Sequence, residues 1–206
     1  MEFTFYISAF VTLFVVIDPI GLAPLFVAIT QGMAAHERRA IALRASGVAI
    51  GLLTLFGLFG ESVLGFAGIS MAAFRIAGGM LLFLTAMEML FERRTKRRED
   101  QAGDDRPDPS VFPLATPLMA GPGAMASMIL LTGEVRGDWA GMAGVLGVMV
   151  AVIAVVLTLF LAAGLLERAL GRTGINVVTR LLGMLLAALS VQFVLDGLRD
   201  FGLAPM

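Results

Sequence analysis

Six long apolar runs, separated by short charged or turn-forming segments, occupy nearly the whole of this 206-residue chain. A helix needs about 20 apolar residues to cross the hydrocarbon core of a membrane, and each run is of roughly that length. The chain is 58% hydrophobic and 15% charged, whereas soluble domains carry about 25% charged residues. We therefore predict membrane-spanning helices near Phe3–Thr30, Ile41–Glu61, Met71–Phe91, Val111–Thr132, Trp139–Leu166 and Ile175–Leu198.

The positions of the basic residues orient these runs. The connections on one side of the membrane hold eleven Lys and Arg residues, and the opposite side holds only Arg136 and Arg199. The positive-inside rule places the first side in the cytoplasm. We predict a multi-pass protein of the bacterial inner membrane with both termini periplasmic. The eleven residues are Arg38, Arg39, Arg44, Arg93, Arg94, Lys96, Arg97, Arg98, Arg106, Arg168 and Arg172.

The residue types that are scarce exclude several kinds of function. The sequence has no Cys and one His, so it cannot assemble a zinc finger, a disulfide framework or a Cys/His nucleophile pair. A formal net charge of -1 offers no basic surface to nucleic acid. We expect no metal site, no catalytic residue, no nucleic-acid partner and no cofactor beyond a coupling H⁺ or Na⁺.

One long connection divides the chain near its midpoint. It runs from Glu92 to Ser110 and combines basic, acidic and proline residues, so it cannot bury apolar surface. We assign residues 1–91 to an N-terminal three-helix repeat, residues 92–110 to a charged cytoplasmic linker and residues 111–206 to a C-terminal three-helix repeat. Binding of anionic lipid by the linker is an alternative to a plain tether.

Two patterns recur in the same order on either side of this linker. The first run of each half holds a capping residue and two prolines, and the third run holds an Arg followed ten positions later by a hydroxyl residue. Because each half has three spans, the two copies must lie in opposite orientations. We predict an all-α integral membrane protein of six transmembrane helices, built as two inverted three-helix repeats with helices one and four broken. The matching residues are Asp18, Pro19, Pro24, Arg75 and Thr85, and Thr116, Pro117, Pro122, Arg180 and Ser190.

The two broken runs are the candidate binding site. A proline inside a helix removes a hydrogen bond at a cost of about 3 kcal/mol, and lipid offers no water in compensation. A half-helix starting at each capping residue would present N–H groups and a positive dipole end to an anionic group such as a substrate carboxylate. A kinked helix whose polar groups are satisfied by neighbours is the alternative. The predicted substrate-binding residues are Asp18, Pro19, Gly21, Pro24, Thr116, Pro117, Gly121, Pro122 and Gly123.

Asp18 lies near the middle of its predicted span, where an acidic group costs about 2.5–3.5 kcal/mol on insertion scales. It is a candidate for holding a substrate ammonium group, a sodium ion or a coupling proton. The alternative is a structural cap buried in protein. An intramembrane enzyme is disfavoured, because no second embedded Asp and no metal-ligand cluster accompanies Asp18.

Four further residues are assigned to gating or pairing. Arg75 and Arg180 can each close one side or pair with an acidic group, and snorkelling to the nearest interface is their alternative role. Thr85 and Ser190 face a pathway or join helices through hydrogen bonds. Glu61 and Glu88 lie near span ends, and we expect both at the membrane interface.

The two proline-rich stretches, Asp18 to Phe26 and Pro117 to Ala124, resemble the signature stretches of the MarC family of bacterial inner-membrane proteins. The resemblance extends over the length of the chain. It implies a place among neutral amino acid transporters and, more distantly, in the lysine-exporter superfamily. It also implies H⁺-coupled or Na⁺-coupled transport of a small neutral amino acid such as glycine or alanine. Leu22 stands where the usual family pattern has a small polar residue, which puts the specificity in question.

Other functions are left open by these patterns. A passive pore would share the broken helices but would carry solute without coupling. An exporter of another small solute and a non-transporting membrane partner protein are further alternatives. The expected partners are membrane lipid and a small amino acid, and a homo-oligomer is not decided by the sequence.

Overall fold

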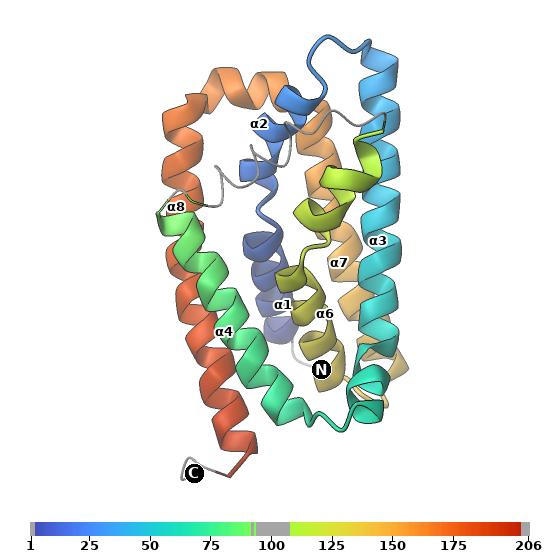
Figure 1. Cartoon of the computed structure of the whole chain (residues 1–206), viewed down its shortest axis with the longest axis vertical. Coiled ribbons are helices and arrows are strands. Elements are labelled where there is room, and N and C mark those ends of the chain that lie inside the picture. The colour runs from blue at the N-terminus through green and yellow to red at the C-terminus, as the bar shows by residue number, and fades with distance from the viewer. Residues whose placement is uncertain (1–2, 92, 94–107, 203–206) are drawn as a thin grey trace.

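The computed structural model describes residues 3–91, 93 and 108–202. The predicted all-α architecture is confirmed, and the described residues contain no strand. The predicted linker, residues 92–110, lies mostly outside the described residues. The elements are α1 (Phe3–Ile17), α2 (Pro19–Ile29), α3 (Ala35–Phe66), α4 (Met71–Leu90), the π-helix η1 (Ser110–Met119), α6 (Pro122–Glu134), α7 (Trp139–Leu161) and α8 (Ala163–Asp200) (Figure 1).

The apolar spans agree with the six predicted runs. Five described spans are long and apolar enough to cross a membrane, and η1 with α6 forms a sixth that is bent by 57°. The protein is therefore an integral membrane protein. Two helix ends differ from the prediction. Helix α3 begins at Ala35, before the apolar run starts at Ile41, because the polar residues that precede the run are also helical. Helix α7 ends at Leu161 and not at Leu166, because the chain turns at Ala162.

The bundle has two distinct ends in Figure 1. Both described termini lie in the lower part of the view, at the end of the bundle that we name the terminal end. The turn between α2 and α3 and the start of η1 lie at the upper end, which we name the linker end. The span α1–α2 runs toward the linker end and the span η1–α6 runs away from it. Opposite directions are what an inverted repeat requires, and the repeat itself stays a prediction.

An ion pair ties the start of η1 to α3 at the linker end. Arg44 Nη1 lies 3.0 Å from Asp108 Oδ2, and the Ser110 hydroxyl donates to Asp108 Oδ1 over 2.7 Å. The hydrogen bonds from the Ser110 hydroxyl and backbone N–H, with a smaller effect from Arg44, hold the pKa of the Asp108 carboxyl below its usual value. Asp108 therefore stays charged beside Arg44, and η1 begins at a fixed place against α3.

The core lies along the two broken spans, α1–α2 and η1–α6, whereas the outer helices expose large apolar side chains to the membrane. Helix α8 packs closely against α4, and glycine allows this approach. A Cβ on Gly79 would lie 2.8 Å from the Ser190 carbonyl oxygen, and one on Gly183 would lie 2.9 Å from Met89 Cβ. These contacts place Ser190 in the joint between the two helices.

Candidate functional site

The first break is centred on Asp18, which is fully buried and has left-handed backbone angles, φ 60° and ψ 65°. Asp tolerates this region because its short polar side chain can hydrogen-bond locally. The Gly21 N–H donates to Asp18 Oδ1 over 3.0 Å, so the predicted capped start of a half-helix is present. The Asp18 carboxylate therefore occupies the end of α2 where we had expected a substrate carboxylate.

The residues that follow Asp18 serve this cap. Pro19 is the first residue of α2, a position where a missing N–H costs nothing. A Cβ on Gly21 would overlap the Asp18 carboxylate, so Gly21 is needed to seat that side chain. Pro24 lies inside α2 and cannot donate a hydrogen bond to the preceding turn. The first break is thus a capped helix start, in which the Asp18 carboxylate binds the N-terminus of its own helix, α2.

The second break differs from its prediction. The half-helix predicted to start at Thr116-Pro117 instead begins at Pro122, with Gly121 as the N-cap of α6. Thr116 is extended, with φ -129° and ψ 123°, because a residue before proline is pushed out of the helical region. Gly121 lies so close to the preceding turn that a Cβ there would be 2.5 Å from the Pro117 carbonyl oxygen.

A cavity of about 240 Å³ lies at this second break. Helix α4 forms one wall, η1 and the first turn of α6 form another, and α1 contributes one residue. The backbone N–H groups of a first helical turn have no partner within the helix, so this wall presents the positive end of α6. The lining residues are Val16, Leu81, Leu84, Thr85, Glu88, Pro117, Leu118, Met119, Gly121, Pro122, Gly123 and Ala124.

Thr85 and Glu88 supply the polar side chains of the α4 wall. They are three residues apart, so they lie on one face of the helix. The Thr85 hydroxyl donates to the Leu81 carbonyl oxygen over 3.0 Å, which leaves its own oxygen able to accept a hydrogen bond. Glu88 is partly buried, and its Oε2 is shielded from solvent. The position of Glu88 near the end of its apolar run predicts a place at the membrane interface.

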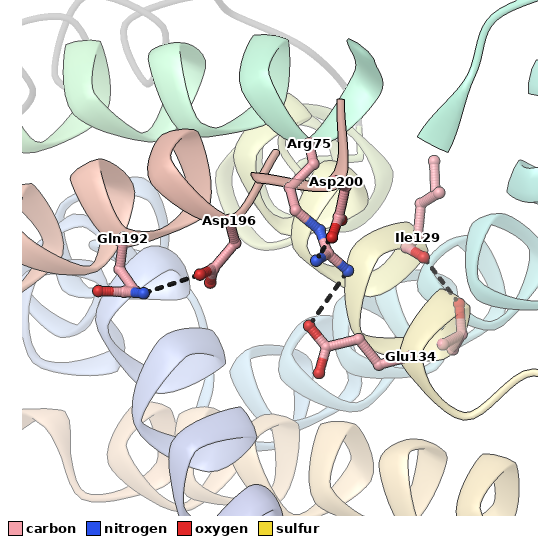
Figure 2. Close-up of polar contacts among 7 residues, drawn as sticks. Arg75, Ile129, Glu134, Gln192, Asp196 and Asp200 are labelled. Carbon is pink, nitrogen blue, oxygen red and sulfur yellow. Dashed lines mark hydrogen bonds and ion pairs between the residues drawn. The ribbon is translucent and has the colours of Figure 1, made fainter. Parts of the chain in front are cut away.

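Arg75 is the centre of an ion-pair cluster at the terminal end (Figure 2). Its Nη1 lies 2.9 Å from Asp200 Oδ2, and its Nη2 lies 3.4 Å from Glu134 Oε1. The Arg75 side chain is only 14% exposed, so the pairing is better shielded than an ordinary surface ion pair. The cluster joins α4, α6 and α8. One turn before Asp200, the Gln192 amide donates to Asp196 Oδ1 over 2.8 Å.

The residues matched to Arg75 and Thr85 in the second half have different surroundings. Arg180 occupies an exposed position on α8 and is no member of the Arg75 cluster. The Ser190 hydroxyl is buried and donates to the Ala187 carbonyl oxygen over 2.7 Å. At the terminal end, Arg136 also forms an ion pair with Glu61, which joins the turn after α6 to α3.

The model of the MarC family integral membrane proteins matches residues 3–201 of this chain. The chain belongs to the MarC family. A UPF0056 membrane protein of Methanocaldococcus jannaschii is 35% identical over 202 residues, which cover 97% of this chain and 98% of the relative. The UPF0056 membrane protein YhcE of Escherichia coli is 35% identical over 203 residues, which cover 96% of this chain and 94% of the relative. No solved structure matches the chain.

In this MarC-family protein the cavity brings together only part of the predicted substrate set. Pro117, Gly121, Pro122 and Gly123 line it, and Thr85 joins them from α4. The residues that do not line it are Asp18, Pro19, Gly21, Pro24 and Thr116. The spacing of Glu88 from Thr85 could have revealed its place beside Thr85. Glu88 lies three residues after Thr85 and four after Leu84, and Thr85 lies four after Leu81, so all four share one face of the helix.

Proposed function

We propose that this MarC-family protein is a secondary transporter of small neutral amino acids, such as glycine and alanine. The observation that carries the proposal is the cavity at the break between η1 and α6, which is lined by residues of three membrane-spanning segments. Its volume of about 240 Å³ is below the roughly 300–1,000 Å³ of pockets that bind drug-sized ligands. A solute of a few heavy atoms suits this space.

The first turn of α6 supports a carboxylate subsite. Gly121, Pro122 and Gly123 bring the N-terminus of α6 to the cavity wall, where the helix dipole favours negative charge. Gly121 and Gly123 have no side chains, so a ligand can approach the backbone there. The substrate carboxylate is thus assigned to α6 instead of α2, because Asp18 already caps α2.

The membrane setting follows from the basic residues. The positive-inside rule assigns the linker end to the cytoplasm and the terminal end to the periplasm of a bacterial inner membrane. In alternating access, the two halves rock about the cavity so that it opens to one side at a time. Coupling to H⁺ or Na⁺ supplies the driving force, and the proposed mechanism includes no other cofactor.

We expect purified protein in proteoliposomes to take up labelled alanine or glycine saturably under an imposed H⁺ or Na⁺ gradient. Replacing Ala124 by Leu adds a larger side chain at the cavity wall and should lower the uptake rate at least tenfold. Ala154→Leu, on the exposed face of α7, is the matched control and should transport as the unmodified protein does. If folded protein takes up neither amino acid under either gradient, the proposal of amino acid transport is wrong. Binding of another small solute would then indicate that the protein exports that solute.

We also propose that the Arg75 cluster closes the route between the cavity and the terminal end. Helices α4 and α6 each line the cavity near one end and join the cluster near the other. Arg75 and Thr85 are ten residues apart on α4, so about 15 Å of helix separates the two sites. Opening the terminal end requires α4, α6 and α8 to separate, and the ion pairs oppose that separation.

Replacing Arg75 by Gln should open the terminal end more often. The chain has no native Cys, so a single Thr85→Cys change reports access to the cavity without background. We expect its labelling by a membrane-impermeant thiol reagent, added at the terminal end, to rise severalfold in Arg75→Gln. Arg136→Gln breaks the more exposed pair with Glu61 and is the control. Equal labelling rates in Arg75→Gln and the control would reject the closing role.

A further inference from the structure

We infer that Glu88 is the cation-binding group of the cavity and holds the ammonium group of the substrate. This inference rests on the proposed transport function and adds to it the residue that recognises an amino acid rather than a carboxylic acid. It starts from the place of Glu88, which lines the same cavity as the first turn of α6 and lies one helical turn from Thr85.

The charge of the cavity wall supports the inference. Among the described residues that line the cavity, Glu88 is the one with a charged side chain. A carboxylate is costly within a membrane-spanning helix, and such residues usually mark a substrate or ion pathway. A carboxylate on the wall attracts a cation, and an N⁺–H···O⁻ hydrogen bond is about twice as strong as a neutral one.

The remaining walls fit the rest of an amino acid. The positive end of α6 suits the carboxylate, and the Thr85 oxygen can accept a further hydrogen bond from the ammonium group. Gly121, Gly123 and Ala124 let the substrate approach the backbone, and the cavity volume of about 240 Å³ limits its side chain to a small one. A zwitterion whose carboxylate and ammonium groups are bonded to the same carbon, as in an α-amino acid, therefore complements the cavity.

Asp18 is the other acidic candidate within a span, and its geometry argues against the same role. Its carboxylate accepts the Gly21 N–H, is fully buried and does not line the cavity. Taking the ammonium group would require that cap to open. Glu88 lies in the last turn of α4 and lines the cavity itself.

The test measures binding of L-alanine and L-lactate to the purified full-length protein by calorimetry. Lactate keeps the carboxylate and the methyl group but replaces the ammonium with a hydroxyl. We expect the unmodified protein to bind alanine at least about tenfold more tightly than lactate. Glu88→Gln should lose this preference by weakening alanine at least about tenfold while leaving lactate unchanged. Glu61→Gln, which alters a carboxylate away from the cavity, should keep the preference.

The outcomes separate the two proposals. Lactate binding as tight as alanine in the unmodified protein, or alanine binding within twofold in Glu88→Gln, would overturn the role of Glu88 and leave transport intact. Failure of the folded, unmodified protein to bind any amino acid would overturn both. If Glu88→Gln does not fold, Glu88→Asp takes its place, and the alanine-to-lactate ratio of the unmodified protein remains decisive.

Discussion

Replacing Gly121 by Ala should destabilise the folded protein by about 2–3 kcal/mol and abolish substrate binding. The added Cβ would lie 2.5 Å from the Pro117 carbonyl oxygen, which is well inside van der Waals contact. The obstructing atom belongs to the backbone, so no side chain can rotate to relieve the overlap. The turn from Pro117 to Gly121 must widen, and that movement displaces the wall of the cavity.

The measurement is denaturant or thermal unfolding in detergent, followed by alanine binding under conditions where the variant is folded. Gly147→Ala is the matched control, because a Cβ at this helical position on α7 meets nothing within 4 Å. Ala is the better helix former, so this control should unfold at the same or a slightly higher denaturant concentration. Two glycine variants that behave alike would show that the close approach at Gly121 has no structural role.

Local signals in the sequence were sufficient to predict the membrane spans and the position of the first break. Each apolar run crosses the membrane as one helix or one bent pair, because lipid leaves the backbone no other way to satisfy its polar groups. Asp18-Pro19 predicted a helix start because a capping side chain and a proline act within one turn. Both features depend on residues that are neighbours in the chain.

The second break was misplaced for a related reason. Thr116-Pro117 has the same local pattern as Asp18-Pro19, yet the helix starts at Pro122. Proline excludes the helical region for the residue before it and also suits the first position of a helix, so each of the two prolines was a candidate start. The close approach of Gly121 to Pro117 decides between them, and that contact is visible only in three dimensions.

The pairs formed by Arg75 could not be read from the sequence at all. Its partners Glu134 and Asp200 lie 59 and 125 positions further along the chain. The place of Glu88 at the cavity could not be predicted either, because a position near the end of an apolar run predicts a place at the membrane interface. Only the packing of α6 against α4 places that side of the helix at the cavity.

Asp18→Ala and Asp18→Asn should differ, and the difference separates a cap from a charge. Asn keeps an oxygen that accepts the Gly21 N–H and tolerates left-handed backbone angles, so Asp18→Asn should lose only about 1 kcal/mol. Ala loses the cap, leaves the partly buried Gly21 N–H without its acceptor and is strained at φ 60°, so Asp18→Ala should lose about 3 kcal/mol.

Substrate binding by the same two variants completes the argument. The Asp18 carboxylate does not line the cavity, so Asp18→Asn should bind alanine within about threefold of the unmodified protein when both are folded. Calorimetric titration after confirming a single species by size exclusion gives this comparison. If Asp18→Asn folds normally but loses alanine binding or ion coupling, the buried charge itself serves transport. The hydrogen bond from the Gly21 N–H to the Asp18 carboxylate would then have to break during the transport cycle, because it is formed in the present structure.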